Sequence, residues 1–133
     1  MRCWKKVFIT IGLATMFGGL VWGAEPKVWH VTATKDQTFV VDGEKNPVVT
    51  VKAGEAVHLK ITAEKAQRVA SDGSVHSFTI KELASQGWDL KLKQGTQEYT
   101  LTAPSKPGEY LVQCMVFCGT AHAGQKMKLV VLP

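Results

Sequence analysis

The sequence predicts an all-β domain, an antiparallel sandwich or Greek-key barrel of seven to eight strands. Two observations favour this fold class. Short runs of alternating apolar and polar residues, or of β-branched residues, recur along the chain, and turn-forming pairs separate them at intervals typical of a sandwich. The only helical candidates of note, residues 64–69 and 82–86, have room for no more than a turn or two each.

Eight segments are expected to form the strands. The first four are rich in Val and Thr or alternate strictly, and the later four carry the same patterns up to the last residues of the chain. Turn chemistry separates them, as in Asp42-Gly43, Asp72-Gly73 and Lys106-Pro107-Gly108. In chain order the expected strands are residues 27–34, 38–41, 48–52, 56–62, 76–80, 97–102, 108–113 and 126–132.

The first residues have the pattern of a secretion signal. Arg2, Lys5 and Lys6 are followed by no charge at all from residue 7 to residue 24. We expect cleavage after Gly23, which makes residues 1–23 the signal peptide and 24–133 the domain. A retained membrane anchor is the alternative, but glycines interrupt the uncharged run, which falls short of the roughly 20 residues that a span needs.

Removal of the signal changes the charge of the protein. The whole chain has 16 basic and 11 acidic residues and a net charge of +5. Loss of the three basic residues of the signal leaves 13 against 11, a net charge of +2. This near balance gives little ground for a nucleic-acid partner. Residues 24–133 are enough for one core and too few for two.

Cys114, Cys118 and His122 follow one another at four-residue steps near the end of the chain. Four residues of extended strand would hold the two sulfurs about 13 Å apart, so this segment must bend if they are to bind one metal site. Gly119 is placed to permit the bend. Thiolates and imidazoles are ligands that copper prefers, and His76, in an expected strand, offers a second imidazole.

Other roles for these residues are open. Two cysteines in an exported protein often form a disulfide, but the two histidines favour a metal. Zinc can use the same four side chains, although structural zinc sites more often take their cysteines in two separated pairs. A thiol enzyme with His122 as base is disfavoured because no orienting acid lies near the pair.

Three motifs resemble those of one family. They are Val75-His76-Ser77-Phe78, Pro107-Gly108-Glu109-Tyr110, and the run from Cys114 through Cys118-Gly119 to His122. In order and spacing they are similar to the cupredoxins, and among them to the dinuclear copper A domain of cytochrome c oxidase subunit II and nitrous oxide reductase. The resemblance implies a cupredoxin-like Greek-key fold. It also implies that the sulfurs of Cys114 and Cys118 bridge two copper ions, that His76 and His122 bind one ion each, and that the carbonyl of Val116 is a weak outer ligand.

The weak methionine ligand of that family has no clear counterpart. Its usual place, three residues after the second histidine, holds Gln125, and Met127 lies two residues further on. Because neighbours two apart on a strand point to one face, either side chain can reach the metal if the strand begins near Gln125. Gln can replace Met as a weak copper ligand. We name both and place Met127 slightly ahead, since a five-residue spacing also occurs in mononuclear cupredoxins.

The resemblance implies an exported copper protein, periplasmic or otherwise outside the cytoplasm, that transfers single electrons. Two copper ions are expected, and one is possible. The implied partners are a c-type cytochrome as donor and an oxidase or reductase as acceptor, with membrane contact only through a partner or an uncleaved N-terminal segment. Whether the protein is an enzyme is left open, because it can be the electron-entry subunit of a terminal oxidase or reductase. The alternatives are a periplasmic copper chaperone or store and a mononuclear cupredoxin.

Overall fold

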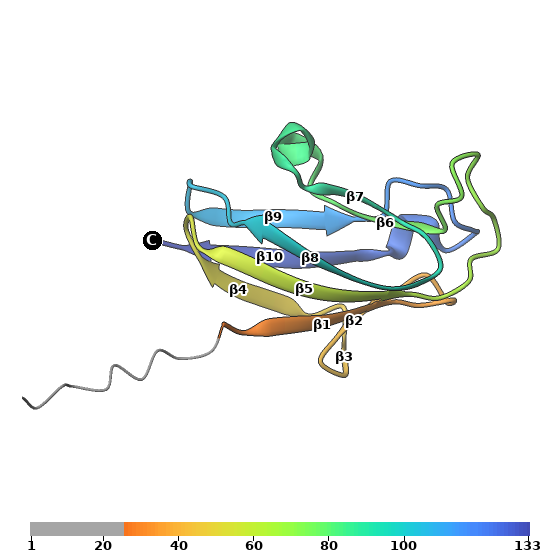
Figure 1. Cartoon of the computed structure of the whole chain (residues 1–133), viewed down its shortest axis with the longest axis horizontal. Helices are drawn as coiled ribbons and strands as arrows, with labels where there is room; N and C mark the ends of the chain where they lie inside the picture. Colours follow the sequence, from red (N-terminus) through yellow and green to blue (C-terminus); the bar gives the residue numbers. More distant parts are fainter. Residues whose placement is uncertain (1–25) are drawn as a thin grey trace, which may run out of the picture.

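The computed structural model describes residues 26–133. The predicted signal peptide and its cleavage site lie outside the described residues. Two five-stranded sheets pack face to face, with strand orders β3-β2-β1-β5-β8 and β4-β10-β9-β6-β7 (Figure 1). Within residues 26–133, no helix is both long and apolar enough to cross a membrane. The strands are β1 (Val28–Ala33), β2 (Phe39–Val41), β3 (Glu44–Lys45), β4 (Val48–Lys52), β5 (Ala56–Ala63), β6 (His76–Thr79), β7 (Asp89–Leu92), β8 (Gly95–Thr102), β9 (Gly108–Gln113) and β10 (Lys126–Leu132).

The predicted β-sandwich is confirmed, and all eight expected strands are present. Two more strands, β3 and β7, bring the number in the described part to ten. β3 has only two residues, and β7 follows directly on the 3₁₀ helix η1 (Lys81–Gln86), so neither stands out as a separate run. The sheets are mixed rather than purely antiparallel, because β1 pairs with β5 and β4 with β10 in parallel.

Of the two short helical candidates, one forms. Residues 82–86 lie in η1, whereas 64–69 form an irregular loop. The backbone of that loop bonds to other segments instead of to itself. The N–H of Glu64 donates to the carbonyl of Ala33 at 2.9 Å, and the N–H of Arg68 donates to the carbonyl of Cys118 at 3.3 Å. These bonds hold the loop against β1 at one end and against the cysteine segment at the other.

The core lies between the two sheets and follows from strand alternation. Along β5 every second side chain, from Val57 to Ala63, is buried, and β10 buries Met127, Leu129 and Val131 in the same way. Aromatic contacts join the layers: Phe39 of β2 and Phe78 of β6 meet edge to face with ring centroids 5.6 Å apart. The sandwich therefore gives a rigid support to the loops at its ends.

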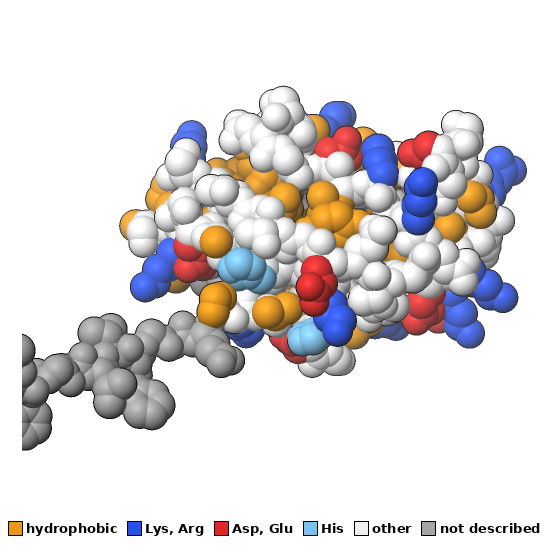
Figure 2. Space-filling view, in the orientation of Figure 1, with side chains coloured by type: hydrophobic (Ala, Val, Ile, Leu, Met, Phe, Trp, Pro, Cys, Tyr) orange, Lys and Arg blue, Asp and Glu red, His pale blue; other side chains and the backbone are white. Residues whose placement is uncertain are grey.

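Three connections meet at one end of the sandwich, on the right in Figure 1. They are the β1–β2 turn, the β5–β6 loop at residues 64–75, and the β9–β10 loop at residues 114–125. On the face shown in Figure 2, basic and acidic side chains are interspersed around the periphery. No single sign of charge dominates this face.

Candidate metal centre

Three of the predicted ligands meet inside this end of the sandwich. One nitrogen of His76 and the Sγ atoms of Cys114 and Cys118 all lie within 4.8 Å of one another, and all three residues are buried. The two sulfurs are 3.5 Å apart, and both cysteines are free. A disulfide would bring them to about 2.05 Å. The two thiols are thus close but unbonded, which is the state that a metal needs.

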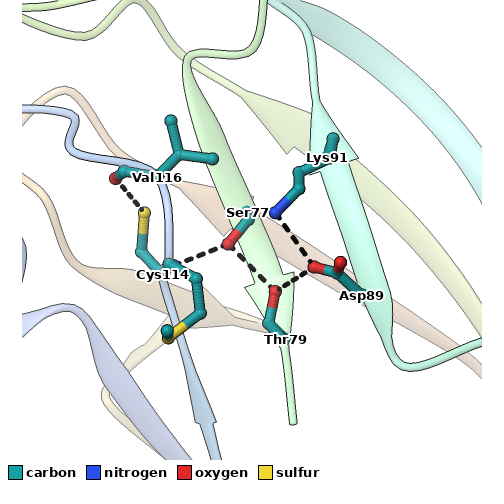
Figure 3. Close-up of polar contacts among 7 residues, drawn as sticks. Ser77, Thr79, Asp89, Lys91, Cys114 and Val116 are labelled. Carbon is teal, nitrogen blue, oxygen red and sulfur yellow. Dashed lines mark hydrogen bonds and ion pairs between the residues drawn. The ribbon is translucent and has the colours of Figure 1, made fainter. Parts of the chain in front are cut away.

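The bend predicted for the cysteine segment occurs just after β9. The N–H of Cys114 donates to the carbonyl of Gln125 at 3.1 Å and closes the base of the loop. The thiol of Cys114 donates to the carbonyl oxygen of Val116 at 3.1 Å (Figure 3). The Val116 carbonyl, to which the resemblance assigns a weak-ligand role, therefore faces the sulfur of Cys114.

The ring of His76 is held in one orientation. Its Nε2 lies 2.9 Å from the carbonyl oxygen of Glu64, and a carbonyl can only accept, so Nε2 carries the proton. Nδ1 then has the free lone pair and points to the side-chain amide of Gln125, 3.3 Å away. Burial lowers the pKa of His76, and its hydrogen bonds with the Gln125 side chain and the Glu64 carbonyl oppose the shift. A neutral ring with a fixed tautomer is what metal coordination requires.

Gln125 and Met127 do not share the site. The Gln125 side chain is fully buried and accepts a bond from the thiol of Cys118, with Oε1 3.3 Å from Sγ. Met127 lines a small core cavity with Trp29, Phe78 and Trp88. Both side chains point to the interior, but two residues of strand place Met127 about 7 Å deeper. Gln125 thus contacts Cys118 and His76, whereas Met127 packs in the core, and the slight preference for Met127 as weak ligand stays a prediction.

His122 lies next to the group formed by His76, Cys114 and Cys118. It begins the short helix η2 (His122–Gly124), is partly buried, and its Nδ1 lies 3.5 Å from Sγ of Cys118. It does not belong to the group of three that lies within 4.8 Å. Its ring contacts the exposed ring of Phe117, with centroids 5.7 Å apart. His122 therefore connects the buried cluster to the surface.

The thiol of Cys118 keeps its proton at neutral pH because its pKa is raised. Burial, and after it the proximity of Cys114, raises the pKa of Cys118 from 9.0 to about 12. Each thiol also has an acceptor for its proton, Val116 for Cys114 and Gln125 for Cys118. A metal ion must displace these protons to bind.

Two glutamines that the sequence did not single out hold the outer part of the loop. The side-chain oxygen of Gln37 accepts from the N–H of Ala121, and that of Gln67 accepts from the N–H of Thr120 at 3.1 Å. Both amides press on Gly119, whose added Cβ would lie 2.6 Å from Oε1 of Gln67 and closer still to the Gln37 amide. Glycine is needed here for close approach as well as for the bend. In the sequence only Gly119 indicates that this loop is tightly packed, because no local pattern shows that distant glutamines contact it.

Comparisons with known proteins identify the fold. No protein-family model and no curated protein matches the sequence. Among solved structures, a chain of a heme-copper terminal oxidase dimer determined by cryo-EM has a TM-score of 0.59 and 20% identity over 79% of this chain and 63% of that chain. The chain thus spans less than two thirds of that oxidase chain. The periplasmic domain of cytochrome oxidase subunit II from Bradyrhizobium japonicum has a TM-score of 0.52 and 15% identity over 80% of this chain and 86% of that one.

A dithionite-reduced auracyanin from Roseiflexus castenholzii is similar to the same extent, with a TM-score of 0.51 and 20% identity over 84% of this chain and all of that chain. Together these likenesses establish that the protein has a cupredoxin-like β-sandwich fold. The resemblance to cupredoxins and to the copper A domain is confirmed at the level of the fold.

Proposed function

We propose that the protein binds copper at the end of its sandwich and transfers single electrons. One observation carries this proposal: a histidine nitrogen and two free cysteine sulfurs, all of buried residues, converge within 4.8 Å in a cupredoxin-like fold. The donor set fits copper, because thiolate sulfur suits Cu(I) and imidazole suits both oxidation states. The fixed tautomer of His76, with Nδ1 free, fits as well.

The proposed ligands are His76, Cys114, Cys118 and His122, with Val116 and Gln125 as weak outer ligands. We propose two ions, bridged by the sulfurs, because the sulfurs lie 3.5 Å apart and two histidines are near them, His76 within 4.8 Å of both and His122 at 3.5 Å from Cys118. When bound, copper supplies a one-electron redox couple. The chain contributes rigidity: the bonds of His76 to Glu64 and of Cys114 to Gln125 fix ligands from both sides of the site.

An apolar surface beside His122 is the proposed docking site for redox partners. Phe117 is 56% exposed and Met115 is 42% exposed, on either side of Val116 in the cysteine loop. The guanidinium of Arg68 lies over the Phe117 ring at 5.2 Å and orders it. The exposed apolar side chains lie beside His122, the proposed ligand nearest the surface. Such a surface suits a brief contact with a c-type cytochrome donor and with an oxidase or reductase acceptor. The proposed compartment is the periplasm or another space outside the cytoplasm, reached by the segment 1–23.

The test is to reduce the protein, load it with copper, and measure copper per chain together with visible absorption and electron paramagnetic resonance. A purple species with two coppers per chain and a seven-line hyperfine pattern would support the dinuclear proposal. No bound copper after reduction would contradict the proposed function altogether.

A mononuclear cupredoxin or a copper-handling protein is the second candidate. It is favoured by the fact that only three ligand atoms lie within 4.8 Å, with His122 touching Cys118 alone. A four-line spectrum would indicate one copper, and a colourless Cu(I) form would indicate handling. The variant Cys114→Ser separates the cases, because it removes a bridging sulfur and should abolish a dinuclear centre, whereas a mononuclear centre on Cys118 would survive.

A further inference from the structure

A chain of hydrogen bonds runs from the backbone of the cysteine loop to the molecular surface (Figure 3). The N–H of Met115 donates to Oγ of Ser77 at 2.7 Å, and Oγ of Ser77 lies 3.0 Å from Oγ1 of Thr79. Oγ1 of Thr79 lies 2.9 Å from Oδ1 of Asp89, which pairs with Nζ of Lys91 at 3.2 Å. Five residues from β6, β7 and the loop are thus joined in one line.

The inner part of this chain is shielded from water. Ser77 is 0% exposed and Thr79 is 3% exposed, whereas Asp89 and Lys91 reach the solvent. Two hydroxyl groups buried without partners would be costly, but here each has partners on both sides. The chain therefore connects a buried position beside the ligands to a surface ion pair.

Oγ of Ser77 accepts from two groups, the N–H of Met115 and the hydroxyl of Thr79. Thr79 has a single hydroxyl proton, and Oδ1 of Asp89 is a second acceptor within its reach. Because a hydrogen bond that ends on a charge is the stronger kind, Asp89 holds the Thr79 hydroxyl in place beside Ser77.

The hydrogen-bond chain lies where the two strands that lead to the ligands are no longer paired through their backbones. Strands β6 and β9 carry His76 and lead into Cys114, but their backbone pairing is limited to Thr79 with Gln113. No ladder therefore joins the two segments where the ligands stand. Met115 follows Cys114 and Ser77 follows His76 in the sequence. Their hydrogen bond therefore joins the two segments just past the end of the backbone ladder.

We infer that Ser77 and Thr79 are positioning residues that fix the spacing between His76 and Cys114, and that Asp89 orients them. This inference rests on the proposed function for the meaning of that spacing, but the bond from Ser77 to the loop exists without metal. The rival explanations are that the hydroxyls only fill space or that Asp89 acts by its charge alone.

The first experiment measures hydrogen exchange of the Met115 amide in the reduced, metal-free protein. The variants Ser77→Ala and Thr79→Val should speed it about tenfold, which corresponds to roughly 1.4 kcal/mol. Thr79→Ser keeps the hydroxyl and should restore slow exchange. The control Thr62→Val removes one member of the Thr62–Thr96 hydroxyl pair in the other sheet, at 2.8 Å, and should change nothing at Met115. The amide of Leu129 is the internal reference for global opening.

The second experiment loads the same variants with copper and records the absorption spectrum and the rate of copper release to a chelator. Thr79→Val should shift the spectrum and speed release about tenfold, the lower end of effects seen when outer-shell partners of metal ligands are lost. Thr79→Ser should return both to the original values. A space-filling role predicts no rescue by this smaller residue.

Several results would overturn the inference. Unchanged Met115 exchange in both Ser77→Ala and Thr79→Val would do so, as would faster exchange with an unaltered spectrum and release rate. An effect of Asp89→Asn with none of Thr79→Val would assign the effect to charge alone. If the protein without substitutions binds no copper, the proposed function fails. Hydrogen exchange of the Met115 amide then decides by itself whether the hydrogen-bond chain positions the loop.

Discussion

The side-chain oxygen of Gln125 lies 3.3 Å from the sulfur of Cys118, and its amide nitrogen lies 3.3 Å from Nδ1 of His76. One side chain therefore touches two proposed ligands that are 42 residues apart in the sequence. Gln125 occupies the place that the cupredoxin resemblance gives to a weak methionine ligand. The identity of this residue is thus a means of tuning the site.

Replacement of Gln125 should affect copper, and replacement of Met127 should not. Gln125→Leu removes the contacts to Cys118 and His76, so we expect about tenfold weaker copper binding and an altered visible spectrum. Met127→Leu keeps core volume and should cost less than about 1.5 kcal/mol of unfolding free energy with no spectral change. Titration with copper and chemical denaturation check both. A spectral change in Met127→Leu alone would restore the order that the sequence favoured.

Alkaline pH should destabilise the reduced, metal-free protein through Cys118. Its pKa is raised in the folded state, so the stabilisation is complete below the ordinary value of 9.0 and is lost as pH rises toward about 12. The measurement is the free energy of unfolding at about pH 8 and at about pH 10.5, with thiolate absorbance as a second signal. Cys118→Ser is the control, because its hydroxyl does not titrate in this range. An equally steep decline in that variant would assign the effect to other groups.

Replacement by alanine should destabilise the protein at one glycine of the ligand loop and not at the other. Gly119→Ala forces a methyl group against Gln37 and Gln67 and should cost about 1–3 kcal/mol, with faster exchange of the Thr120 and Ala121 amides. Gly124→Ala is the matched control, because nothing lies within 4 Å of its added Cβ. Thermal unfolding and amide exchange test the pair. Equal costs at both positions would mean that the glutamines do not confine Gly119.

Phe117 should matter for partner contact and little for the fold. It is 56% exposed beside His122, so Phe117→Ala should slow electron transfer with a c-type cytochrome about tenfold, as expected when an aromatic anchor is lost. The absorption spectrum should stay the same. Leu132→Ala is the control, since Leu132 is 45% exposed and lies at the end of β10 that is remote from the loop. Stopped-flow mixing measures both rates, and equal slowing would contradict a docking role for Phe117.

Much of the fold followed from local patterns. β5 alternates along its whole length and β10 does so in its first half, so burial on one face was visible there in the residue order. β3 and β7 were missed because two residues carry no period and because β7 adjoins η1. The parallel pairing of β1 with β5 is a long-range choice that no local pattern records.

The cysteines and His76 could be found from residue type and spacing, but their supporting contacts could not. Gln125 and Met127 point to the same face of the sheet, and only their positions along the strand decide which side chain reaches the cysteines. Alternation in the sequence predicts the face and not that position. The contacts of Gln37 and Gln67 join turns that are distant in the sequence. Ser77 was part of the recognised motif, yet its bond to Met115 depends on where the β6–β9 ladder stops.

The pairing of β10 has a consequence for the order of events during biogenesis. Lys128 pairs with Val48, 80 residues earlier, and the bond from Cys114 to Gln125 closes the ligand loop just before this strand. Pairings of such long range form late because their loop-closure entropy must first be overcome. Until β10 docks, Gln125 is absent from the pocket and the two thiols are open to oxidants. The buried group of His76, Cys114 and Cys118 is therefore enclosed only as the last strand completes the sandwich.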